Sequence, residues 1–141
     1  NINNTKFLNS KFKNTVIKGQ FLANISFIKY DMDLMNFELA EVNNMKIENS
    51  SLIGANLKSA KFSNSKILNT NMEGTVLTDA KISNTDLIGV NLKGANLENA
   101  TLSNVDLTNS NLEQVNIINL KLEGVIFCNT VMPSGIRNDQ C

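Results

Sequence analysis

Residues 85–104 read TDLIG-VNLKG-ANLEN-ATLSN, four blocks of five in which the third residue is always leucine. The same spacing extends in both directions. Stepping by five from Ile2 to Met132 meets a large apolar residue at all 27 positions, with no insertion. We call this third residue the centre of each pentad. A period held over nearly the whole chain predicts a repetitive architecture.

Other places in the pentad are selective as well. The residue two before the centre is Ala, Ser, Thr, Val or Gly in 21 of 27 cases, and the residue two after it is Asn or Gly in 20. On an α-helix a step of five residues rotates by about 500°, so the centres would form no stripe. On a straight strand successive centres would change face. The chain must therefore turn once per pentad, with Asn or Gly supplying the positive φ, and this predicts a solenoid.

The runs Gly94-Ala95-Asn96-Leu97 and Asn99-Ala100-Thr101-Leu102 resemble the pentapeptide-repeat family, and the resemblance covers residues 1–135. It implies an all-β fold, a right-handed quadrilateral parallel β-helix with four pentads per coil and about 6–7 coils in total. We expect residues 1–132 to form this helix with every centre in its core. Residues 133–141 are expected to form a non-repeat tail that folds across the last coil. Because no capping segment precedes Ile2, we also expect Asn1 to lie at a processing or cloning boundary.

The repeat is least regular near its N-terminus. Six residues at the place two before the centre are bulky, and five of them lie in the early coils: Gln20, Ile25, Tyr30, Met35 and Met45. We expect wider or distorted coils there.

The two cysteines both lie at the C-terminal end. Cys128 follows the centre Phe127, and Cys141 is the last residue. The sequence allows either two separate thiols or a disulfide bridge. The position of both cysteines at the same end favours the bridge, which would stabilise the fold by about 3 kcal/mol on the chain-entropy model. Residues 127–135, FCNTVMPSG, resemble the ends of cyanobacterial and thylakoid-lumen members, which typically read Asp in place of Ser134. With a bridge, this resemblance implies a thylakoid lumen or periplasm; the alternative is the cytoplasm.

One face of the expected coil carries apolar residues that point outward. At 20 residues per coil, the place after the centre on this face holds Leu8, Ile28, Leu68 and Ile88, and Ile126 joins them near the C-terminal end. Exposed aliphatic side chains on one face can mark a partner site. Alternatively, they lie flat over the corners and serve only the structure. Two other faces carry columns of asparagine before the centre, which we interpret as structural ladders.

Composition weakens several functional classes. The chain has 13 basic and 13 acidic residues and no histidine, so it lacks the usual general base and metal ligand near neutral pH. No carboxylate pair or glycine-rich phosphate loop stands out, and we expect no enzyme activity, cofactor or metal. No apolar run approaches the roughly 20 residues of a membrane span, so we expect no membrane insertion.

Charge alternates along the chain. Residues 1–30 sum to +5, 31–57 to −4, 58–93 to +2 and 94–141 to −3. Such bands favour mutual pairing over a single-sign surface that would bind nucleic acid. Some pentapeptide-repeat proteins act on DNA gyrase as DNA mimics, and this alternative requires a strongly acidic surface that a net charge of zero does not supply.

The sequence therefore predicts a non-enzymatic structural or protein-binding solenoid. Its partner is expected to be another protein rather than nucleic acid. The chain is expected to be a monomer or an end-to-end dimer formed through the open N-terminal coil.

Overall fold

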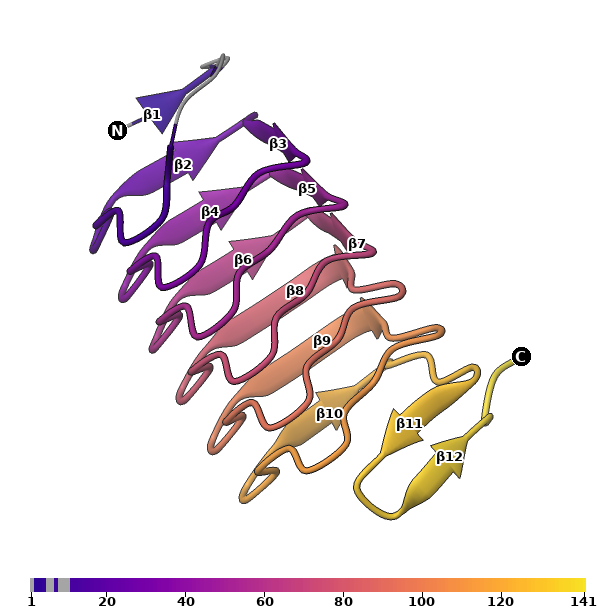
Figure 1. Cartoon of the computed structure of the whole chain (residues 1–141). Helices are drawn as coiled ribbons and strands as arrows, with labels where there is room; N and C mark the ends of the chain where they lie inside the picture. The colour runs from indigo at the N-terminus through magenta and orange to yellow at the C-terminus, as the bar shows by residue number, and fades with distance from the viewer. Residues whose placement is uncertain (1, 5–6, 8–10) are drawn as a thin grey trace.

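The computed structural model describes residues 2–4, 7 and 11–141, and these form a right-handed parallel β-solenoid of about six turns (Figure 1). No helix occurs among the described residues. The prediction of an all-β parallel β-helix is therefore confirmed. The strands described are β1 (Ile2–Asn3), β2 (Phe21–Ala23), β3 (Ser26–Ile28), β4 (Glu41–Asn43), β5 (Lys46–Glu48), β6 (Lys61–Ser63), β7 (Lys66–Leu68), β8 (Lys81–Asp86), β9 (Thr101–Asp106), β10 (Lys121–Glu123), β11 (Thr130–Met132) and β12 (Gly135–Arg137).

The strands stack with a register of 20 residues. Leu22 pairs with Val42, Val42 with Phe62, and the column continues to Leu122 on β10. A second side of the rod is built in the same way by β3, β5 and β7 and by the second halves of β8 and β9. The two remaining sides are held by isolated bridges with the same offset. Four pentads thus make one coil.

The residue two after each centre makes the corner. From residue 14 to residue 129, every one of these residues has a φ between 47° and 67°. Asparagine and glycine tolerate this left-handed conformation best, which explains why they dominate the position. On the two sides without strands, a tight turn follows each centre. Ala55 N–H, for example, donates to Leu52 C=O at 3.0 Å.

The centres form one continuous core along the axis. All those from Leu22 to Leu112 are at most 3% exposed. Buried Ser and Thr at the small position donate to backbone carbonyls, as Thr85 Oγ1 does to Ser83 C=O at 2.8 Å. The bulky Met35 and Met45 of the early coils are also fully buried, and the 20-residue register runs through them without interruption.

The last coil departs from the expected core. The centres Ile117 and Leu122 are 42% and 40% exposed, so the expectation that every centre is buried is wrong there. The reason is the path of the tail. After Met132 the chain turns into β12, which pairs antiparallel with β11 on a different side of the rod. Arg137 of the hairpin lies over the centre Phe127, and the centre Met132 is itself part of β11, whereas the other half of the end is open.

Candidate protein-binding surface

The side built on β3, β5 and β7 carries the outward aliphatic residues. Along these strands the centres point inward, so the residues after them face outward. Ile28 pairs with Glu48, and Glu48 with Leu68. Asn69 N–H then donates to Ile88 C=O at 2.9 Å, which places the next coil directly above. The outward column therefore reads Ile28, Glu48, Leu68 and Ile88.

The structure brings only part of the expected face together. Leu68 and Ile88 are half-buried neighbours in successive coils. Ile28 is 45% exposed and is separated from them by Glu48, which forms an ion pair with Lys46. Ile126 is 37% exposed and lies in the column before the centre, next to Asp106. Leu8 lies outside the described residues.

Asparagines border this pair and hold the backbone. Asn69 Oδ1 lies against Gly89, where an added Cβ would approach it to 2.5 Å. On the neighbouring side, Asn91 Nδ2 donates to Asn71 Oδ1 at 3.1 Å, and Asn71 Oδ1 also accepts from Glu73 N–H at 3.1 Å. These amides bridge successive coils and fix turns, so their role is structural.

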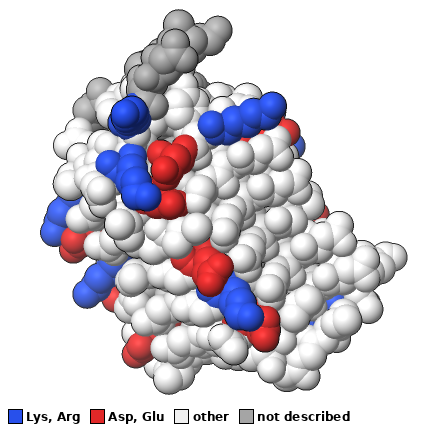
Figure 2. Space-filling model, viewed as in Figure 1, with Lys and Arg blue, Asp and Glu red and all other residues white. Residues whose placement is uncertain are grey.

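Charged residues pair from coil to coil. Four pairs join residues 20 apart at N–O distances of 2.7–3.2 Å: Lys18–Glu38, Glu41–Lys61, Lys66–Asp86 and Lys93–Glu113. In Figure 2 a line of alternating acidic and basic side chains follows the rod, with a broad uncharged surface beside it. The positive and negative segments of the sequence therefore pair with each other between neighbouring coils. Because the charges are paired, the exposed aliphatic residues are what distinguishes the surface.

Sequence reasoning missed a second group of exposed apolar residues. Leu34 and Leu39 are each 53% exposed and occupy corners with φ of 57° and 60°. Val16, Ile53 and Val76 are also exposed. The signal was present in the sequence, because leucine stands twice in early pentads where Asn or Gly is usual.

Few features for small-molecule chemistry occur in the described part of the chain. No group of three or more potential metal ligands is found among residues 2–4, 7 and 11–141. A cleft of about 780 Å³ lies near the N-terminal end, with Lys11, Lys29, Phe12 and Tyr30 among its lining residues. No helix of the described residues is long and apolar enough to cross a membrane.

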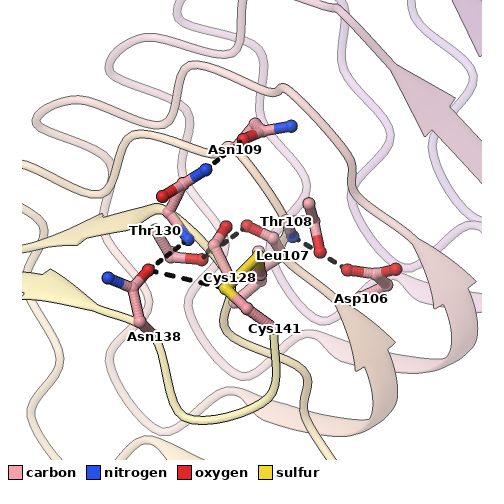
Figure 3. Close-up of a disulfide and its surroundings, with 9 residues drawn as sticks. Asp106, Leu107, Thr108, Asn109, Cys128, Thr130, Asn138 and Cys141 are labelled. Carbon is pink, nitrogen blue, oxygen red and sulfur yellow. Dashed lines mark hydrogen bonds between the residues drawn. A yellow bond between two sulfur atoms is a disulfide. The ribbon is translucent and has the colours of Figure 1, made fainter.

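The structure joins Cys128 and Cys141 in a disulfide (Figure 3). Around it, the backbone N–H of Asn129 donates to Asn138 Oδ1 at 2.6 Å, and Thr130 Oγ1 donates to Leu107 C=O at 2.8 Å. The guanidinium of Arg137 lies 3.9 Å from the centre of the Phe127 ring. These contacts hold the tail against the last coil.

Comparison with known proteins gives a family match and several similar folds. The model of pentapeptide repeats matches eight copies, at residues 55–94 and 91–127. The search of curated proteins returned no match. HetL, a pentapeptide-repeat protein involved in heterocyst differentiation regulation in the cyanobacterium Nostoc sp. strain PCC 7120, is 21% identical with a TM-score of 0.63. The match covers 91% of this chain and 62% of HetL, so the chain spans less than two thirds of that protein.

Two further solved structures are similar. QnrB1, a plasmid-mediated fluoroquinolone resistance protein, is 12% identical with a TM-score of 0.56, over 79% of this chain and 74% of QnrB1. A pentapeptide-repeat protein from the thylakoid lumen of Arabidopsis thaliana is 23% identical with a TM-score of 0.47, over 70% of this chain and 65% of that one. At these identities the likeness to HetL and QnrB1 shows the fold alone.

Proposed function

The chain belongs to the pentapeptide-repeat family, and from this premise we propose that it is a non-enzymatic solenoid that binds another protein through its side. The observation that carries the proposal is the pair formed by Leu68 and Ile88. The two aliphatic side chains lie in successive coils, on a sheet in which β7 is hydrogen-bonded to β5 on one edge and to β8 on the other. Rigid apolar surface of this kind binds with little loss of conformational entropy.

The alternative role as a DNA mimic is less well supported by the charge distribution. A mimic must present a continuous acidic surface in place of phosphates. Here Glu38, Asp86 and Glu113 each have a lysine partner in a neighbouring coil. Pairing cancels much of the field that such a surface needs. We therefore expect no inhibition or protection in a gyrase supercoiling assay.

An oxidising compartment, the periplasm or a thylakoid lumen, is the location that we propose. The supporting observation is the Cys128–Cys141 disulfide, because such bonds persist where thiols are not kept reduced. In the cytoplasm, the alternative location, the same two residues would be free thiols.

A double variant tests the binding surface. We expect Leu68→Lys with Ile88→Lys to lose at least one partner in affinity capture from the source organism, because two charges would have to be desolvated at the contact. The matched control is Ser83→Lys with Ser103→Lys. These serines are also half-buried, occupy the same place in the pentad and lie on the neighbouring side of the rod. Identical partners for wild type, test and control would remove the proposal.

A further inference from the structure

The second coil departs from the corner pattern at two places. Among the corners from residue 14 to residue 129, apolar side chains occur only at Leu34 and Leu39, whereas the others carry Asn, Gly, Ser, Asp, Lys or Gln. The two leucines are five residues apart, so they lie at the two ends of one side of the same coil. Each is 53% exposed. Two exceptions on one side form a surface, where a single one would be an isolated substitution.

Leucine is an unfavourable residue at these corners. With φ of 57° and 60°, Leu34 and Leu39 adopt the left-handed conformation that brings Cβ close to the following carbonyl, which Asn and Gly tolerate better. Each side chain also leaves apolar surface in water. Unfavourable backbone conformations of this kind are concentrated at functional sites. The two leucines are therefore better explained by binding than by folding.

Further exposed aliphatic residues lie around the two leucines. Leu34 N–H donates to Ile53 C=O at 2.9 Å, and Ile53 is 39% exposed. At Gly54 an added Cβ would lie 2.8 Å from Leu34 Cδ2, so the glycine leaves room for the leucine over the next corner. Val16 and Val76 are 68% and 36% exposed and lie in one outward column of the side between the leucines. We call Leu34, Leu39, Ile53, Val16 and Val76 the corner-leucine surface.

The charges beside this surface favour an acidic partner. Glu38, between the two leucines, is paired with Lys18 at 2.9 Å. Lys58 follows Glu38 in the same outward column, is exposed, and forms no ion pair with any described residue, including Asp79 in the next coil. Leu39 N–H donates to Lys58 C=O at 3.0 Å, which places this lysine next to the leucine. An unpaired cation beside exposed aliphatic side chains is complementary to an apolar segment that carries a carboxylate.

We propose that the corner-leucine surface binds a segment of a partner protein that presents apolar side chains to Leu34 and Leu39 and a carboxylate to Lys58. This surface lies on a different side of the rod from Leu68 and Ile88, so it is a second site that can bind independently of the first. Leu34, Leu39 and Lys58 have further coils on both sides, so their exposure does not depend on either end of the rod.

Selection of peptides tests the chemistry of the partner. The probe is a displayed library of random peptides of about 12 residues. Peptides are selected on wild type, and those that also bind the double variant Leu34→Asn with Leu39→Asn are discarded. We expect the remaining peptides to combine aliphatic or aromatic residues with Asp or Glu. A library that yields no peptide able to distinguish the two proteins would overturn the proposal, and so would selected peptides without an acidic residue.

Fluorescence anisotropy with one selected peptide measures the contribution of Lys58. Lys58→Glu should weaken binding by about tenfold or more, because a like charge then faces the carboxylate of the peptide. The matched control is Lys81→Glu, since Lys81 is also exposed and has no ion pair among the described residues but lies on another side of the rod. It should bind the peptide like wild type. Equal weakening by both variants would mean unspecific attraction between charges and would contradict the proposed site.

Thermal denaturation separates binding from stability. Asparagine tolerates the left-handed conformation, so Leu34→Asn and Leu39→Asn should each raise Tm, by up to about 4 °C, while they abolish peptide binding. The control Gln114→Asn changes an exposed corner in the same column as Leu34 and should leave peptide binding unchanged. If both leucine variants lowered Tm, the leucines would serve the fold, and the proposal would be wrong.

Discussion

The interior coils and the last coil are built from the same pentad but differ in what covers them. Leu97 in the interior is 1% exposed, whereas Leu122 at the end is 40% exposed, although both are leucines at the centre of a pentad. The interior leucine has a coil above and below it, and the terminal one has a coil on one side only. The comparison shows that burial in this fold is a property of the stack and not of the pentad.

Within the last coil the two halves differ for a related reason. Phe127 and Met132 are only 3% and 8% exposed: Arg137 of β12 lies over the Phe127 ring, and Met132 is itself part of the β11–β12 hairpin. Ile117 and Leu122 have no such cover from the described chain. A tail of nine residues therefore replaces half of a coil, and the other half has no cover among the described residues.

We expect the largest difference in the free energy of unfolding when the same substitution, leucine to alanine, is made at Leu97 and at Leu122. Leu97→Ala should lower the free energy of unfolding by about 3–5 kcal/mol, because it leaves a cavity between two fixed coils. Leu122→Ala should cost about 1 kcal/mol, since much of the side chain is already in water. Urea denaturation at a protein concentration at which the chain is monomeric measures both values.

Both variants are compared with wild type. An unchanged m-value shows that each variant exposes as much surface on unfolding as wild type does. Equal losses at the two positions would mean that Leu122 is covered in solution even in the monomer. The open half would then be absent.

Removing the disulfide should loosen the covered half of the last coil. Replacing both Cys128 and Cys141 by serine removes a link between residues 13 apart in sequence and should cost about 3 kcal/mol. Because the link lies in the cap, hydrogen exchange should accelerate in residues 127–137 and stay slow in the interior coils. Non-reducing mass spectrometry should find wild type two hydrogens lighter than the dithiol. Exchange rates that do not respond to a reductant would contradict the role assigned to the bridge.

The interior could be predicted from sequence because its information is local and repeated. Each pentad has a centre, a small residue and a corner, and their spacing determines which side chains point inward. The corner conformation followed from Asn and Gly, and the structure extends it to Leu34, Leu39 and Gln114, which have the same positive φ. Neighbouring coils impose this φ even where the residue does not favour it.

The ends could not be predicted in the same way. The pentads at Leu122 and Leu102 have the same centre, and although Leu120 stands where the other has Ala100, this difference does not predict that Leu122 is exposed. Its exposure depends on where the tail goes. Residue 137 occupies the place of a centre, but it is arginine, and the preceding Pro133 and Gly135 direct the chain into a hairpin. On the candidate binding face, the break at Glu48 was visible in sequence, but the half-buried state of Leu68 and Ile88 depended on packing across coils.

The smallest contrast concerns two glycines with the same surroundings. At Gly89 and Gly124, φ is 65° and 60°, and an added Cβ would lie 2.5 Å from the side-chain oxygen of Asn69 or Asn104 in the coil below. Gly89→Ala should cost about 1–2 kcal/mol, since both the backbone and the asparagine must adjust between fixed coils. Gly124→Ala should cost less, because the last coil can shift toward its open side. Gly74→Ala, where an added Cβ meets nothing within 4 Å at a φ of 63°, measures the backbone contribution alone. If thermal denaturation gave Gly124→Ala the same cost as Gly89→Ala, the last coil would be as rigid as the interior, and the difference between them would lie only in exposure.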